Sequence, residues 1–207
     1  MDPLAGLSAA KVQAKTIADA EAASSFTMKG SIAQPGQSFT VNLAIKPSHG
    51  CTGTIGLGAK GNLRLIVINK TVYLNPDNTF WKASSGADAA TVIALVDGRY
   101  IEAPASDSSM AAWAQLCDVS QLFSSNGSTS GPVKEAVTTL NGIRVLPIKD
   151  SDSTAYVTDA SKPELVQLSA PKGSKNGSGL VTVTMNVPVT LTAPPASQVI
   201  DGSKLGM

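Results

Sequence analysis

The chain has 207 residues, and 16 Lys and Arg against 15 Asp and Glu give it a formal net charge of +1. This length suits one ordinary domain, and the balanced charge argues against nucleic-acid binding, which depends on clustered cations. With one His and two Cys, a zinc, haem or iron–sulfur site lacks the ligands it needs, so we expect no cofactor and no metal. We expect a single domain over residues 1–207, with flexible ends at 1–6 and 202–207.

The first third of the chain predicts a helix followed by strands. Ser8 is a suitable N-cap, and Val12, Ile17 and Ala20 recur at close to helical spacing. Apolar and polar residues then alternate, as in half-buried strands joined by turns. The expected strands are residues 26–32, 39–45, 52–57, 63–69, 71–74 and 80–82.

The pattern changes at Gly86. Residues 87–96 fit a helix that Gly98 would stop, a brief strand is expected at 99–101, and residues 110–123 fit one or two short helices. After a loop at 124–132, strands are expected at 133–140, 143–148, 154–157, 165–169 and 180–186. About ten short strands in succession predict an α+β fold with one large antiparallel sheet, an N-terminal helix and a central helical insertion.

A sheet of this size twists and curls, so helices laid against its concave side can leave an apolar hollow. One face of each expected strand is apolar, but the alternation fits a solid core equally well. The chain has only 4 Phe, 2 Trp and 3 Tyr, and aliphatic walls suit acyl chains better than stacked rings. The sequence therefore leaves both a pocket and a packed core open.

The two cysteines bear on the compartment. The N-terminus lacks the basic and apolar regions of a secretory signal, which fits a cytosolic protein or an exported one whose signal has been removed. The low charged fraction of 15%, with abundant Ser, Thr and Gly, favours export. An exported pair usually forms a disulfide, here Cys51–Cys117, and the alternative is two buried cytosolic thiols.

Residue patterns for catalysis are weak. His49 is the sole imidazole and the only base available for a Ser–His–Asp mechanism. It lies in a turn-like Pro-Ser-His-Gly segment, and the chain has no G-x-S-x-G motif. We therefore expect a protein that is not an enzyme, with a hydrolase that uses His49 as the least favoured option.

Several segments carry a resemblance to a known family over nearly the whole chain. They are residues 2–8 (DPLAGLS), 22–25 (AASS), 50–55 (GCTGTI), 66–73 (IVINKTVY), 80–82 (FWK), 116–118 (LCD), 188–195 (PVTLTAPP) and 200–203 (IDGS). In these the chain resembles actinobacterial cell-envelope lipoproteins of the LppX/LprG group, which share a half-barrel with the lipoprotein carriers LolA and LolB. The resemblance implies a strongly curved antiparallel sheet, helices over its open side, and an apolar pocket between them.

The resemblance also implies function and location. It predicts an exported monomer that binds a lipid or an acylated apolar molecule, held to the outer face of the cell membrane by an N-terminal lipid anchor upstream of Met1, and that carries its ligand through the cell envelope. The helical insertion would act as a lid, tethered by Cys51–Cys117. The competing hypothesis is a structural or interaction protein with a solid core. The residues we expect to line the pocket are Leu43, Leu65, Val67, Val92, Leu95, Met110 and Trp113.

Overall fold

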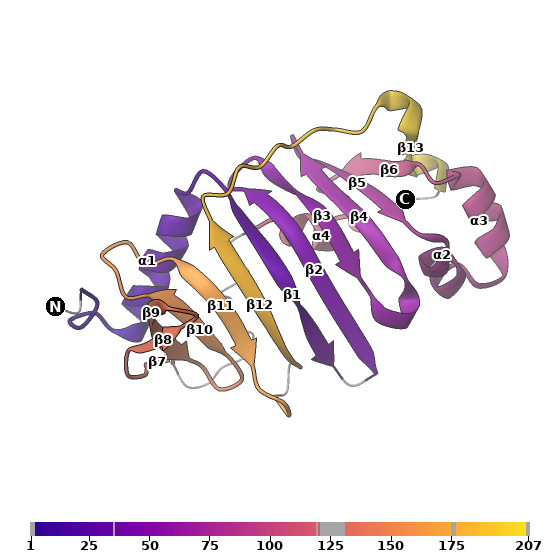
Figure 1. Ribbon diagram of the computed structural model, residues 1–207. Coiled ribbons are helices and arrows are strands. Elements are labelled where there is room, and N and C mark those ends of the chain that lie inside the picture. Colours follow the sequence, from indigo (N-terminus) through magenta and orange to yellow (C-terminus); the bar gives the residue numbers. More distant parts are fainter. Residues whose placement is uncertain (1–2, 35, 119, 121–130, 175–176, 206–207) are drawn as a thin grey trace.

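The computed structural model describes residues 3–34, 36–118, 120, 131–174 and 177–205 (Figure 1). These residues form one 13-stranded sheet with four α-helices. The helices are α1 (Ala9–Glu21), α2 (Asn78–Ser84), α3 (Ala89–Val96) and α4 (Ala111–Gln115). None of the described helices is long and apolar enough to cross a membrane.

The strands follow the chain in two series. The first series is β1 (Phe26–Gln34), β2 (Gln37–Lys46), β3 (Gly50–Gly56), β4 (Asn62–Ile68), β5 (Thr71–Pro76) and β6 (Tyr100–Pro104). The second is β7 (Val133–Lys134), β8 (Thr138–Leu140), β9 (Ile143–Lys149), β10 (Thr154–Thr158), β11 (Leu165–Ala170), β12 (Ser178–Met185) and β13 (Val199–Asp201).

The two series join in the middle of the sheet. The strand order is β13-β6-β5-β4-β3-β2-β1-β12-β11-β10-β9-β7, with β8 also paired to β9. All described pairings are antiparallel except β13 with β6, which is parallel. Figure 1 shows the chain after β12 crossing the ends of the β1–β5 strands to reach β13. The predicted α+β class, with a large antiparallel sheet, an N-terminal helix and central helices, is confirmed.

Helix α1 forms as its sequence predicts. The Ser8 side chain accepts a hydrogen bond from the backbone N–H of Lys11 at 3.3 Å and so caps the helix. Val12, Thr16 and Ala20 are buried on one stripe, and the Thr16 hydroxyl donates to the carbonyl of Val12 at 2.9 Å. The helix thereby buries one side against the sheet and satisfies the one polar group on it.

Residues 80–82 were expected to form a strand, and this prediction was wrong, because they lie in α2. Asp77 is the N-cap, and its carboxylate accepts hydrogen bonds from the backbone N–H groups of Phe80 at 2.8 Å and Asn62 at 2.9 Å. The cap satisfies the backbone N–H of Phe80, which in a strand would have needed a carbonyl of a neighbouring strand. Trp81 is then buried against the core.

The second half of the chain also differs in part from the predicted elements. The single strand expected at 133–140 is divided into β7 and β8, and the strand at 199–201 was not predicted, because three residues are too few to show alternation. The helices expected at 110–123 are represented by α4, and residues 119 and 121–123 lie outside the described residues.

The sheet has two distinct faces. The helix-covered face carries the buried side chains, such as Leu43 on β2 and Leu65 on β4, and packs against α1 and α4, which Figure 1 shows behind the sheet. The open face, turned toward the reader in Figure 1, carries the alternate residues, such as Asn42 and Arg64, which are exposed. The period-two alternation of the strands thus separates an apolar side from a polar one.

Candidate functional site

The candidate site is the space between the helix-covered face and the helices α1 and α4. Leu43, Leu65 and Val67 point from β2 and β4 into this space and are buried. Met110, which immediately precedes α4, is also buried, and Trp113 on α4 is half-buried against the same cluster. Five of the residues expected to line a pocket therefore belong to one apolar cluster under α4.

The two expected residues on α3 lie elsewhere. Helix α3 packs against α2 at the β6 end of the molecule (Figure 1). Val92 is half-buried and contacts the edge of the core, whereas Leu95 is 42% exposed and is not part of the cluster. The structure thus brings together the residues on the strands and on α4, but it does not place Leu95 beside them.

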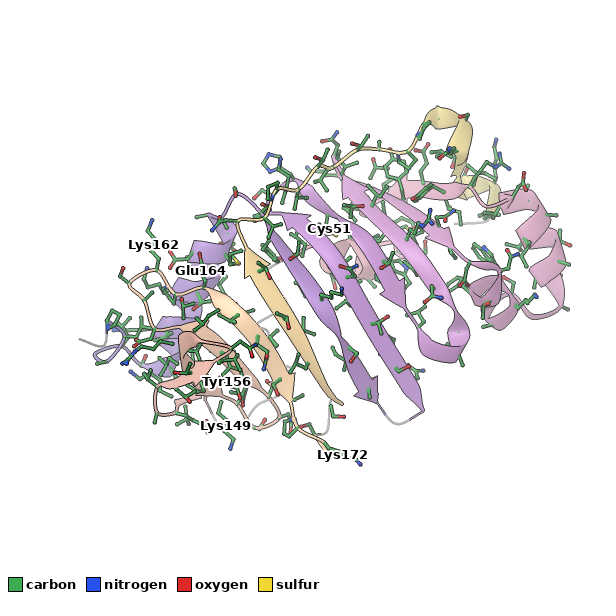
Figure 2. All side chains as sticks on the ribbon, in the orientation of Figure 1. Cys51, Lys149, Tyr156, Lys162, Glu164 and Lys172 are labelled. Carbon is green, nitrogen blue, oxygen red and sulfur yellow. A yellow bond between two sulfur atoms is a disulfide. The ribbon has the colours of Figure 1, made fainter. Side chains whose placement is uncertain are left out.

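A disulfide joins α4 to the sheet. Cys51, labelled on β3 in Figure 2, is bonded to Cys117, which follows α4, with a Cα–Cα distance of 5.4 Å. Cys51 is fully buried on the helix-covered face. The expected Cys51–Cys117 bond is confirmed, and it holds the chain after α4 against the middle of the sheet.

A pocket of about 480 Å³ opens beside this disulfide. It lies where the end of α1, the turn between β2 and β3, and the end of α4 meet. Its lining combines two carboxylates, a hydroxyl, backbone and the disulfide, from the residues Glu21, Pro47, Ser48, Gly50, Ala114, Cys117 and Asp118. Polar and apolar groups thus line the pocket together beside the apolar cluster, and we refer to this pocket below as the entrance.

Sequence reasoning did not identify this entrance, apart from Cys117. Its residues come from helix ends and a turn, where no periodic pattern distinguishes a lining residue from any other exposed one. Asp118 accepts hydrogen bonds from the backbone N–H and the hydroxyl of Ser120 at 2.9 and 2.8 Å. The nearness of Glu21 to Asp118 arises only from tertiary packing, and no sequence signal marked it.

His49 lies in the turn between β2 and β3, next to the entrance. It is exposed, and its Nδ1 donates to the carbonyl of Pro47 at 2.8 Å. This bond orients the imidazole within its own turn. Within the described residues, no three side chains of His, Cys, Asp or Glu form a group suited to a metal ion.

The described residues with shifted pKa values include Tyr73 on β5 and Asp77 at the start of α2. Partial burial, with the charge of Glu102 opposite on β6, raises the pKa of Tyr73 on β5. Burial opposes ionisation of Asp77, but the hydrogen bonds from Phe80 and Asn62 outweigh it and lower the pKa of Asp77. Both shifts arise from structural contacts away from the entrance.

Three solved structures are similar to this chain to different degrees. LprF from Mycobacterium bovis, a lipoprotein of the LppX/LprG family, is similar with a TM-score of 0.57 and 15% identity, over 90% of this chain and 96% of that one. An uncharacterized conserved protein from Thermus thermophilus covers 93% of this chain and 98% of its own, with a TM-score of 0.46 and 8% identity. MucB, in complex with the periplasmic part of MucA, covers 92% of this chain and 58% of its own, with a TM-score of 0.35 and 7% identity.

The chain has the fold of LprF. No family model matches its sequence, and no curated protein matches it either. At 15% identity the likeness to LprF is one of fold. It confirms the resemblance to the LppX/LprG group that the sequence segments carried.

Proposed function

We propose that this protein binds a lipid or another apolar molecule between the helix-covered face of its sheet and the helices α1 and α4. The observation that carries the proposal is the pocket beside Cys117, which opens between the two helices next to a continuous apolar cluster. A mouth with polar groups next to an aliphatic interior matches a molecule with a polar head and acyl chains. The LprF-like fold supports the same function.

The proposed pocket needs a sheet that curves around the ligand. Close approaches of neighbouring strands at two glycines support such a curvature. A Cβ atom built on Gly30 of β1 would lie 2.0 Å from the carbonyl oxygen of Leu180 on β12, and one on Gly53 of β3 would lie 2.0 Å from that of Asn42 on β2. Glycines with such contacts mark places where a sheet bends tightly. We propose that the sheet curls around the ligand at these positions.

The disulfide gives the proposed site its lid. We propose that the described segment 110–118, with α4, covers the apolar cluster and is tethered to β3 through Cys51–Cys117. Ligand entry then requires the ends of α1 and α4 to separate at Glu21 and Asp118, while the tether keeps the segment in place. Leu43, Leu65, Val67, Met110 and Trp113 would contact the ligand.

The proposal includes a location outside the cytoplasm. A buried disulfide persists in oxidising compartments, and the fold is that of a lipoprotein. We propose that the protein is held on the outer face of the cell membrane by a lipid anchor, and that it carries its ligand through the envelope without catalysing a reaction. The expected monomer fits this role.

Native mass spectrometry after gentle extraction tests the proposal directly. A binding protein should retain lipid, or take up a fluorescent fatty acid after delipidation. Leu65→Trp should abolish uptake with little loss of stability, because the ring would occupy ligand space. Ile66→Trp, the next residue on β4 but on the open face, is the matched control and should leave uptake unchanged. A lipid-free mass with no uptake would refute the proposal.

A solid core is the second candidate, and one observation favours it. Leu43 and Met110 are 1% and 0% exposed, so the space around them is already filled. In that case Leu65→Trp would overpack the core and lower the free energy of unfolding by about 1–3 kcal/mol. Urea unfolding of the Leu65 variant therefore separates a structural protein from a carrier.

A further inference from the structure

The open face of the sheet has one sign of charge over its central strands. On β12 and β1 to β5, whose residues are all described, the charged side chains on this face are Lys29, Lys46 and Arg64. The ion pairs within the described ranges use other side chains. The chain as a whole is nearly neutral, so these six strands carry a local excess of cations, and on the same face Glu102 of β6 lies beside them, opposite Tyr73.

Strand register places two of these cations in one row. Lys29 on β1 pairs with Asn42 on β2, Asn42 pairs with Thr54 on β3, and Thr54 pairs with Arg64 on β4. Three strand spacings of about 4.8 Å separate Lys29 from Arg64 by about 14 Å. On the other side of Lys29 the row continues through Thr182 and Gln167 to Tyr156, which Figure 2 labels.

The side chains around the cations are mostly short and polar, with Ile66, Ile68 and Leu180 as large apolar side chains among them. Threonines dominate the neighbouring positions, among them Thr27, Thr40, Thr52 and Thr184. Such residues can hydrogen-bond to phosphate and hydroxyl groups without projecting far from the sheet. The pocket lies on the other side of the sheet, so this face presents a broad polar surface with widely spaced positive charges.

We propose that this open face, defined by Lys29, Lys46, Arg64 and the polar residues between them, docks onto the surface of an anionic phospholipid bilayer. Each Lys or Arg near such a surface strengthens binding about fivefold, and the effect depends on distance and salt rather than on a shaped pocket. Separate cations on a broad face match a diffuse layer of headgroup charge.

A protein partner fits this face less well. Binding energy in protein interfaces is concentrated in Trp, Tyr and Arg side chains surrounded by tight packing, and among these types the central strands offer Tyr73 and Arg64. Asn75, next to Arg64 in the row, already donates to the carbonyls of Gly98 and Arg99. A bilayer needs no such side chains, and weak attraction suffices if the lipid anchor proposed above holds the protein nearby, so this inference rests in part on the proposed function.

The test compares binding of the full chain to vesicles of phosphatidylglycerol and of phosphatidylcholine by sedimentation at low ionic strength. The wild type should bind the phosphatidylglycerol vesicles more strongly, and added salt should remove the difference. Lys29→Gln/Arg64→Gln should weaken binding to phosphatidylglycerol about 25-fold, by fivefold for each cation.

Lys11→Gln/Lys82→Gln is the matched control. It removes the same total charge from exposed positions on α1 and α2, away from the open face, and should weaken binding far less. Equal loss in both variants, or equal binding of the wild type to both kinds of vesicle, would overturn the proposal and leave the face to an acidic protein or to no partner. Fatty-acid uptake, measured in the same samples, reports on the helix-covered face separately.

Discussion

The two faces of this sheet are built from the same strands and differ in almost every property. On β2, Leu43 is buried under the helices, while its neighbour Asn42 is exposed on the open face. The first face gains stability from apolar burial, and the second exposes charges whose interactions salt can screen. A function assigned to one face therefore does not depend on the residues of the other face. Substitutions of adjacent residues on one strand can test the two functions separately.

The largest effect is expected from breaking the disulfide, which holds α4 against the helix-covered face. Cys51→Ala/Cys117→Ala should lower the free energy of unfolding by about 4 kcal/mol, because the bond closes a loop with a sequence separation of 66. Equilibrium urea unfolding measures this loss, and reduction of the wild type should reproduce it. A loss below about 1 kcal/mol would mean that the tether contributes little beyond an ordinary substitution.

The next prediction compares the two faces within one strand. Leu43→Ala should lower the free energy of unfolding by about 2–5 kcal/mol, since it leaves a cavity in the covered cluster. Asn42→Ala, on the open face, should change it by no more than about 0.5 kcal/mol. Chemical denaturation of both variants gives the comparison, and similar losses would contradict the division into a packed and an exposed side.

A smaller effect is expected where β1 and β12 approach each other closely. Gly30→Ala should cost about 1–3 kcal/mol, because its Cβ would meet the backbone of β12 and push the two strands apart. Ser31→Ala, the next residue on β1, adds no atom at such a contact and is the control. If thermal unfolding shows Gly30→Ala to be as stable as Ser31→Ala, then β1 and β12 do not need their close approach.

The smallest effect is a pH dependence at the end of α2. Because the native pKa of Asp77 lies below its usual value of 3.8, the ionised cap stabilises the fold above that pH, and this contribution is lost as the pH falls through the native pKa. Asp77→Asn keeps a capping group that does not titrate. The difference in free energy of unfolding between Asp77→Asn and the wild type should shrink as the pH falls from 5 to 2, as measured by urea unfolding. A difference that stays constant would show that ionisation of the cap does not cause a pH dependence.

The sequence predicted the fold best where alternation was long. Strands such as β2 and β4 show a period of two over several residues, and the helix after Ser8 has both a cap and a stripe. It failed at α2, where the three residues 80–82 were too short to show a period and Asp77 decided the outcome. Local capping chemistry outweighed the expected pairing there.

The candidate site was predictable only in part, for a related reason. The apolar face with Leu43 and Leu65 follows from alternation, and Cys51–Cys117 follows from cysteine count and compartment. The entrance does not, because Glu21, Ser48 and Asp118 come from separate segments that approach one another through packing and the disulfide. Sequence patterns report which face is covered, but they do not report where two helix ends leave a gap.

The pairing of β1 with β12 has a consequence for how the chain folds. Strands β1 to β6 and β9 to β12 each pair with neighbours that are close in sequence, so each series can form locally. Apart from the edge pairing of β13 with β6, the two series meet along β1 and β12, beside the hydrogen bond from Ser24 to Asn186, 162 residues away. Closing so long a loop is slow compared with forming hairpins. We therefore expect the β1–β12 seam to form late, after both halves of the sheet, and to set the folding rate.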